Sequence, residues 1–147
     1  MSADVQVMKD FRKTFRLDEL TIRDRQGWTL SVRPAQITLG SMVVSSTAGH
    51  LDFQAIEREE SVGLSAAFAD AERVAKATFG AVRINIVCLM MKDPVVHFHV
   101  LPRYDRVVER YGATWRDADW PGPPTFGPAP TADTVLRSMV EELKASN

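Results

Sequence analysis

The segment from Val95 to Tyr104, VVHFHVLPRY, constrains the fold of this chain more than any other part of the sequence. The chain has three histidines in 147 residues, and two of them, His97 and His99, are separated here by a single residue. Apolar residues between and around them are typical of a β-strand, in which alternate side chains share a face. We therefore expect both imidazoles to lie on one face of a strand, together with Leu101, and apolar side chains to cover the other face.

Length and composition predict one globular domain over residues 1–147. Hydrophobic residues make up 45% and charged residues 25% of the sequence, which is enough for a core without disulfides or a structural metal. The one cysteine, Cys88, cannot form an intrachain disulfide or a multi-cysteine zinc site. A formal net charge of -1 argues against a general nucleic-acid-binding protein, which would carry a basic face.

Residues 1–13 have a mixed composition and are expected to form a tail, a short helix or an arm. They lack the apolar stretch of a secretory signal, and no run of about 18 apolar residues occurs along the chain. We therefore expect a cytoplasmic protein that has no membrane partner.

Hydrophobic periodicity predicts strands in the first third of the chain, one long helix in the middle, two further strands and a C-terminal helix. The long helix has acidic residues in its first turn, where the helix dipole favours them, and Gly80 directly after its last periodic residue. The elements are expected at residues 15–24, 28–33, 41–46, 57–79, 83–90, 95–103 and 134–145.

This order predicts an α+β fold, with a mostly antiparallel sheet and helices gathered on one side of it. Residues 83–90 are so apolar that we expect a central strand, with residues 95–103 returning antiparallel to it. Six of the eight prolines fall from Pro102 onward, so an irregular wrap is expected before the C-terminal helix. Trp115 and Trp120 in this tail either form an apolar strap over the edge of the sheet or stack on a ring of a bound ligand.

Two histidines at alternate strand positions fit three chemistries. They could be two ligands of a metal site, although such a site needs at least one further ligand. They could be hydrogen-bonded structural residues. In the third interpretation one imidazole, largely neutral at pH 7, attacks phosphorus while the other assists the leaving group. This third interpretation requires both rings to lie on the same side of the sheet and to be reachable from solvent.

The segment His99 to Arg103, HVLPR, resembles the end of the signature of the histidine-triad (HIT) superfamily. In that signature three histidines alternate with apolar residues on a strand, and Pro-Arg often follows. His97 then takes the middle position, and Val95 replaces the first histidine. The resemblance covers about residues 15–104. Further matches along the chain are Gly40, His50, the acidic pair Glu59 and Glu60, and Asn85.

The resemblance implies a HIT-like fold with a five-stranded antiparallel sheet, one main helix and a C-terminal helix. Within the superfamily, this chain resembles bacterial HIT-like proteins and proteins of the diadenosine polyphosphate hydrolase type. Such proteins are typically homodimers that join their sheets and cleave nucleotides at the α-phosphate. No cofactor or metal is implied at the histidines, although magnesium can accompany the substrate phosphates. The HIT-like core would be residues 15–104, followed by the tail and helix of residues 105–147.

The resemblance also implies roles for individual residues. His97 would be the nucleophile that becomes nucleotidylated, and His99 would assist the leaving group. Asn85 would contact phosphate or the active-site loop, unless it is a buried amide that pairs with the backbone. His50 would lie near the site. Because Val95 removes a histidine of the supporting network, we expect catalysis to be slowed by about 10–100-fold rather than lost.

Three basic residues near the motif have open roles. Lys92 lies in the segment that replaces the family's phosphate loop, where it contacts phosphate or is a solvated turn residue. Arg103 binds phosphate or anchors the end of the strand. Arg33 stands where many relatives carry a ribose-binding Asn, which puts the nucleoside preference in question.

The leading hypothesis is a nucleotide-binding hydrolase or nucleotidyl transferase that attacks the α-phosphate of a dinucleoside polyphosphate or a nucleoside phosphoramidate. A catalytically weak nucleotide-binding protein is the first alternative. A metal-dependent enzyme with His97 and His99 as ligands is the second.

Overall fold

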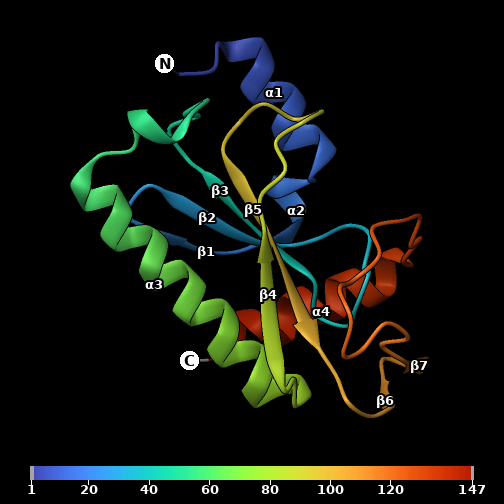
Figure 1. The fold of residues 1–147 in the computed structure, drawn as a ribbon. Coiled ribbons are helices and arrows are strands. Elements are labelled where there is room, and N and C mark those ends of the chain that lie inside the picture. The colour runs from blue at the N-terminus through green and yellow to red at the C-terminus, as the bar shows by residue number, and fades with distance from the viewer. Residues whose placement is uncertain (1, 147) are drawn as a thin grey trace.

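The computed structural model describes residues 2–146, and Figure 1 shows their path. The helices and strands have the following bounds. They are α1 (Val5–Thr14), α2 (Leu17–Leu20), β1 (Thr21–Arg25), β2 (Trp28–Val32), β3 (Met42–Ser46), η1 (Phe53–Ala55), α3 (Arg58–Val74), η2 (Ala75–Phe79), β4 (Arg83–Val87), β5 (His97–Arg103), β6 (Val108–Arg110), β7 (Ala113–Trp115) and α4 (Asp133–Ala145).

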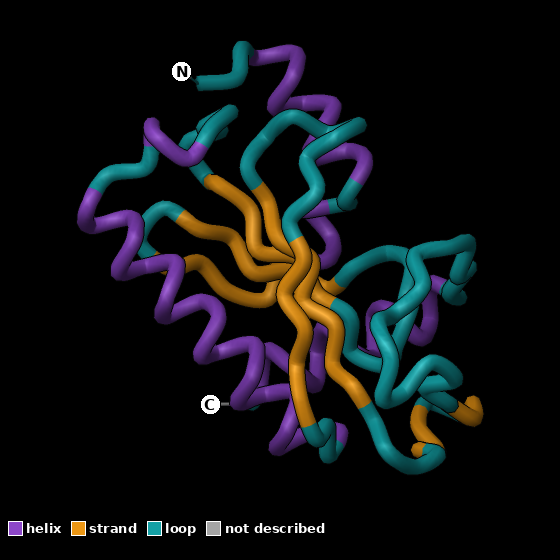
Figure 2. Tube along the Cα trace, in the orientation of Figure 1, coloured by secondary structure: helices purple, strands orange, loops and turns teal. Residues whose placement is uncertain are grey.

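The first five strands form one antiparallel sheet in the order β1-β2-β3-β5-β4, which Figure 2 shows as a strongly twisted fan of strands. The register of β3 and β5 places Val43 opposite His99 and Ser45 opposite His97. The predicted α+β fold, with a five-stranded antiparallel sheet, one main helix and a C-terminal helix, is confirmed.

The main hydrophobic core lies on the face of the sheet that α3 and α4 cover (Figure 1). Trp28, Leu30 and Val100 are fully buried there, and the indole nitrogen of Trp28 donates a hydrogen bond to the carbonyl of Glu60, 2.6 Å away. The helices contribute small side chains from α3 and larger ones from α4. These are Ala67, Ala71, Leu136, Met139 and Leu143.

The opposite face, which carries the two histidines, is covered by α1. Asp4 caps this helix by accepting a hydrogen bond from the backbone of Val7. Phe11 and Phe15, one helical turn apart, pack with Val43 and Val95 in a second hydrophobic cluster. The prediction that the helices gather on one side of the sheet is therefore wrong. The prediction failed because the few apolar residues of α1 form a stripe that is sufficient to bury this second face of the sheet.

The long helix begins with a capping box in which Glu57 and Glu60 each accept a hydrogen bond from the other's backbone. It continues through the π-helical turn η2 and ends at Gly80, whose φ of 73° lies in the left-handed region that glycine adopts without strain. The predicted helix over residues 57–79 is confirmed, as is the C-terminal helix α4.

Three local predictions were wrong. Residues 17–20 form α2 instead of a strand, because the chain turns at Arg16, which has a φ of 52°. Strand β4 lies at an edge of the sheet, with Ile86 41% exposed, although its apolar sequence predicted a central position. The proline-rich tail contains a short hairpin, β6 and β7. None of the helices within residues 2–146 has the length and apolar character needed to span a bilayer.

Candidate functional site

His97 and His99 lie side by side on one face of β5, as their spacing predicts. Their imidazole rings meet at an interplanar angle of 84°, with 5.0 Å between the ring centroids. Strands on both sides of β5 hold this strand in place, so the two rings have a fixed mutual orientation.

The ring of His97 is oriented by the backbone of its own strand. Its Nδ1 lies 2.7 Å from the carbonyl oxygen of Val95. A carbonyl oxygen can only accept a hydrogen bond, so Nδ1 must carry the proton. The neutral ring then has its lone pair on Nε2, which has no hydrogen-bond partner within residues 2–146. An unprotonated Nε2 is the form in which histidine acts as a nucleophile.

His99 has the opposite arrangement, because Arg33 donates to its ring. The guanidinium Nε of Arg33 lies 3.3 Å from Nδ1 of His99. Arginine has only donors, so Nδ1 accepts and the proton of neutral His99 sits on Nε2. Burial, reinforced by the positive charge of Arg33, lowers the pKa of His99 from 6.5 to about 4. His99 is therefore a neutral hydrogen-bond donor at pH 7.

Aromatic side chains cover both rings, which are 3% and 6% exposed. Phe11 and Phe15 of the α1 segment each place a ring centroid 5.3 Å from that of His97. Phe126 from the tail lies 5.4 Å from His99. Of the two requirements of the phosphorus chemistry, the shared face is met. Reachability from solvent is not met in this conformation.

A cavity of about 220 Å³ lies next to this cover. We call it the Arg33 cavity, and it is lined by Thr14, Phe15, Arg33, Pro34, Ala35 and Asp93. Phe15 lines the cavity and also contacts both histidine rings, so this side chain separates the cavity from the rings.

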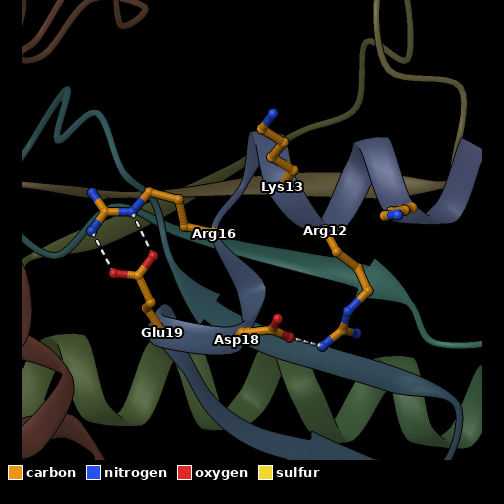
Figure 3. Close-up of a pocket in the computed structure, with 6 residues that line it drawn as sticks. Arg12, Lys13, Arg16, Asp18 and Glu19 are labelled. Atoms are coloured by element: carbon orange, nitrogen blue, oxygen red, sulfur yellow. Dashed lines mark hydrogen bonds and ion pairs between the residues drawn. The ribbon is translucent and has the colours of Figure 1, made fainter.

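A larger pocket of about 570 Å³ lies on the outer side of α1 and α2 and contains none of the predicted site residues. Figure 3 shows two ion pairs in its lining, while Lys9 and Lys13 have no ion-pair partner within residues 2–146. Arg12 pairs with Asp18 at 2.5 Å, and Arg16 pairs with Glu19 at 2.8 Å. This pocket is therefore a solvated ion-pair surface and carries no catalytic constellation.

Comparisons with protein-family models and with curated proteins find no match. Solved structures do match. A Hit-like protein involved in cell-cycle regulation from Bartonella henselae has a TM-score of 0.68 at 14% identity, covering 94% of this chain and 95% of its own. The chain has the histidine-triad (HIT) fold.

Two further solved structures with the HIT fold are similar. A histidine triad (HIT) protein from Sinorhizobium meliloti has a TM-score of 0.64 at 21% identity, covering 87% of this chain and 90% of its own. A hypothetical histidine triad nucleotide-binding protein from Sulfolobus tokodaii has a TM-score of 0.66 at 9% identity, with 95% and 89% covered. At identities this low, the structural matches establish the HIT fold alone, and function has to be argued from the site.

Arg103, the last residue of β5, is a buried clamp. It is 2% exposed, and four of its five N–H donors are used by Asp117, Asn85 and the carbonyl of Gly122. Burial opposes ionisation of Asp117, but the hydrogen bonds from Arg103 hold the pKa of this carboxyl below its usual value. Of the two roles predicted for Arg103, this geometry is that of an anchor for the tail.

Of the other predicted residues, Asn85, His50 and Lys92 form no hydrogen bond to His97 or His99 in the described part of the chain. Asn85 shares their face of the sheet, but its amide oxygen accepts from Arg103. His50 contacts the carboxylate of Glu60 at 2.9 Å, and its Nδ1 is buried without a partner within residues 2–146. Lys92 is exposed in the loop before β5. Arg33 is the one basic residue of the predicted set that touches a histidine of the motif.

The donor set at the rings does not favour a metal. Within residues 2–146, no group of three or more His, Cys, Asp or Glu side chains is arranged to hold a metal ion. The neighbours of the two rings are Phe11, Phe15, Phe126 and the cation Arg33, none of which is a metal ligand.

Phe11, Phe15 and Phe126 are the residues of this site that the sequence did not indicate. The four-residue spacing of Phe11 and Phe15 was a signal for a helix with an apolar stripe. Nothing in the local sequence says that this stripe packs onto the histidines, because that contact joins segments more than 80 residues apart.

Proposed function

We propose that this chain is a nucleotide hydrolase or nucleotidyl transferase of the HIT type, in which His97 attacks the α-phosphate of a nucleoside polyphosphate. One observation carries the proposal. The hydrogen bond from His97 to the carbonyl of Val95 leaves Nε2 unprotonated, while that from Arg33 leaves His99 with a proton on its own Nε2. The strand thus presents a nucleophile and a donor side by side.

The reaction follows from these protonation states. Nε2 of His97 forms a bond to phosphorus, while the bond from phosphorus to the bridging oxygen breaks and its electron pair leaves with that oxygen. The proton on Nδ1 stays, so the nucleotidylated ring becomes positive, and the Val95 carbonyl stabilises that charge. Water then attacks phosphorus, the nitrogen–phosphorus bond breaks, and a proton is released to solvent.

The neutral state of His99 favours one class of leaving group. Because the pKa of His99 is lowered to about 4, the ring at pH 7 supplies a hydrogen bond instead of a full proton. A departing phosphate is stable as an anion, so a hydrogen bond is enough to assist it. A departing amine must gain a proton. The substrate we propose is therefore a phosphoanhydride, such as a dinucleoside polyphosphate, in preference to a phosphoramidate.

Access to His97 requires a movement of Phe15. The Arg33 cavity of about 220 Å³ is smaller than the roughly 300–1,000 Å³ that small-molecule sites usually enclose. Phe15 caps the C-terminal end of α1 and is followed by Arg16 in the left-handed region. Rotation of Phe15 out of its place would join the cavity to the face of His97 and leave the rest of α1 docked.

A nucleotide-binding protein with weak or no turnover is the second candidate. Two observations favour it. The rings of His97 and His99 are only 3% and 6% exposed, and Val95 replaces the first histidine of the motif. The two candidates share the pocket and differ in whether a bond to His97 forms.

Intact-mass measurement under neutral quenching separates them. After mixing with diadenosine tetraphosphate, the wild-type chain should gain the mass of one adenylyl group. His97→Ala should show no gain, and His50→Gln, which removes a histidine that pairs with Glu60, should retain the adduct. Saturable nucleotide binding without adduct or product would support the second candidate. An adduct that persists in His97→Ala would contradict the assignment of the nucleophile.

We also propose that the functional unit is a homodimer joined through β4. This strand has a free edge in the sheet. Ile86 within it is 41% exposed, and Leu89, which follows it, is 51% exposed. An unpaired strand edge with apolar side chains readily pairs with another strand. Antiparallel pairing of two copies of β4 would continue the sheet across the dimer.

A further inference from the structure

Arg33 is a half-buried cation that has no acidic partner within residues 2–146. Every ion pair of the described chain lies elsewhere. Burial lowers the pKa of Arg33, which means that the surroundings disfavour its charge. Charged groups that lose solvent are normally paired, so this guanidinium is poised for an anion that the chain itself does not supply.

The guanidinium has donors to spare. Its Nε donates to His99, and one terminal nitrogen donates to the carbonyl of Ala35 at 2.7 Å. Two of its five N–H donors are thereby used. Phe126 packs against the guanidinium plane, with 5.6 Å between Cζ and the ring centroid, and this contact fixes the plane without satisfying a donor.

Arg33 lines a space of suitable size. The Arg33 cavity of about 220 Å³ is several times the roughly 30 Å³ that one water molecule occupies in the liquid. Asp93 is the other charged residue in its lining, and no ion pair joins Asp93 to Arg33. Asp93 therefore weakens anion binding by repulsion but does not neutralise the guanidinium.

We propose that Arg33 and the Arg33 cavity form a binding subsite for a phosphate group of the ligand other than the one that His97 attacks. The inference rests on the proposed function for the identity of the ligand as a nucleotide. The fork of Arg33 suits the bidentate binding of a phosphate. Through its Nε the same guanidinium holds His99, so occupation of the subsite and the orientation of the catalytic donor depend on one side chain.

Isothermal titration calorimetry with inorganic phosphate tests the subsite on the full chain. We expect saturable binding by the wild type and a loss of roughly tenfold or more in Arg33→Gln, because a charge-assisted contact is removed. Arg33→Lys, which keeps the charge but lacks the fork, should fall between the two. Asp93→Asn should bind phosphate more tightly, because it removes a like charge from the lining.

Control measurements separate the subsite from general electrostatics. Arg58→Gln removes an equal charge from an exposed position at the start of α3 and should bind phosphate like the wild type. Acetate should bind more weakly than phosphate. Circular dichroism of each variant shows whether it is folded. If Arg33→Gln does not fold, Arg33→Lys is compared with the wild type instead.

The outcomes for the subsite and for the proposed function are distinguishable. Phosphate binding that is absent, or equally affected by Arg33→Gln and Arg58→Gln, overturns the subsite, even if an adduct forms on His97. Phosphate binding that depends on Arg33 supports the subsite, even if no adduct forms. Adenosine monophosphate in place of inorganic phosphate then shows whether a phosphate borne by a nucleotide competes for the same cavity.

Discussion

The rings of His97 and His99 meet edge to face, 5.0 Å apart, and the proton of each neutral ring is on a different nitrogen. The Val95 carbonyl fixes one proton and Arg33 fixes the other. Two identical side chains on one strand therefore acquire different chemical roles from their surroundings. This difference between the two rings, more than their spacing, suits this face to the proposed attack on phosphorus.

The lowered pKa of His99 predicts a specific loss of stability in mild acid. Between pH 6.5 and about 4 the unfolded chain protonates His99 while the folded chain does not, so the free energy of unfolding falls as the pH falls through this window. Its full size is up to about 3 kcal/mol, with no contribution above pH 6.5. Urea unfolding at pH 7.5, 6.0 and 5.0 measures it. His99→Gln should show a shallower decline, and equal slopes in both proteins would contradict the prediction.

Removal of the aromatic cover should make His97 reachable. Phe15→Ala should increase the rate at which diethyl pyrocarbonate modifies His97, measured by peptide mass spectrometry, and should lower the free energy of unfolding by about 3 kcal/mol. Phe79→Ala is the matched control, because Phe79 is equally buried but packs in the core on the other face of the sheet. If both variants increase the modification rate alike, general loosening and not gating explains the effect.

The clamp between Arg103 and Asp117 should be a large contributor to stability. Both side chains are 2–3% exposed, and loss of one partner leaves an uncompensated buried charge. Asp117→Ala should lower the free energy of unfolding by about 3–5 kcal/mol. Asp105→Ala removes the partner of Arg106 in an exposed pair and should change it by less than about 1 kcal/mol. A similar small effect for Asp117→Ala would mean that the tail is held by other contacts.

The edge strand predicts how the chain assembles. Light scattering coupled to size-exclusion chromatography should give the mass of a dimer for the wild type and of a monomer for Ile86→Lys, because a charge on the free edge of β4 opposes pairing. Val62→Lys places the same charge at a 61% exposed position on α3 and should remain dimeric. A monomeric wild type at micromolar concentration would refute the proposed interface.

The sequence was most informative where local physics decides. Alternation placed His97 and His99 on one face, and the acidic start and glycine end bounded the long helix. Each of these depends on neighbours within a few residues.

What the sequence did not indicate mostly concerns partners that are distant along the chain, although the helix at residues 17–20 was missed for a local reason, the left-handed turn at Arg16. The cover of Phe11 and Phe15 over the rings and the edge position of β4 are set by tertiary packing, as is the choice of Asp117 as the partner of Arg103. Composition misled in the case of β4, because an apolar strand can be covered by a second chain as well as by its own sheet. The contact between Arg33, which follows β2, and His99 within β5 likewise joins two segments that only the sheet order brings together.

The protonated nitrogen of each ring can be measured directly by long-range ¹H–¹⁵N correlation spectroscopy of the imidazoles at pH 7. The predicted result is a proton on Nδ1 and a bare Nε2 for His97, and a proton on Nε2 and a bare Nδ1 for His99, with the His99 pattern altered in Arg33→Gln. A doubly protonated His97, or a His97 that carries its proton on Nε2, would contradict the account, because no lone pair would then face the phosphorus. A doubly protonated His99 would contradict its role as a neutral donor.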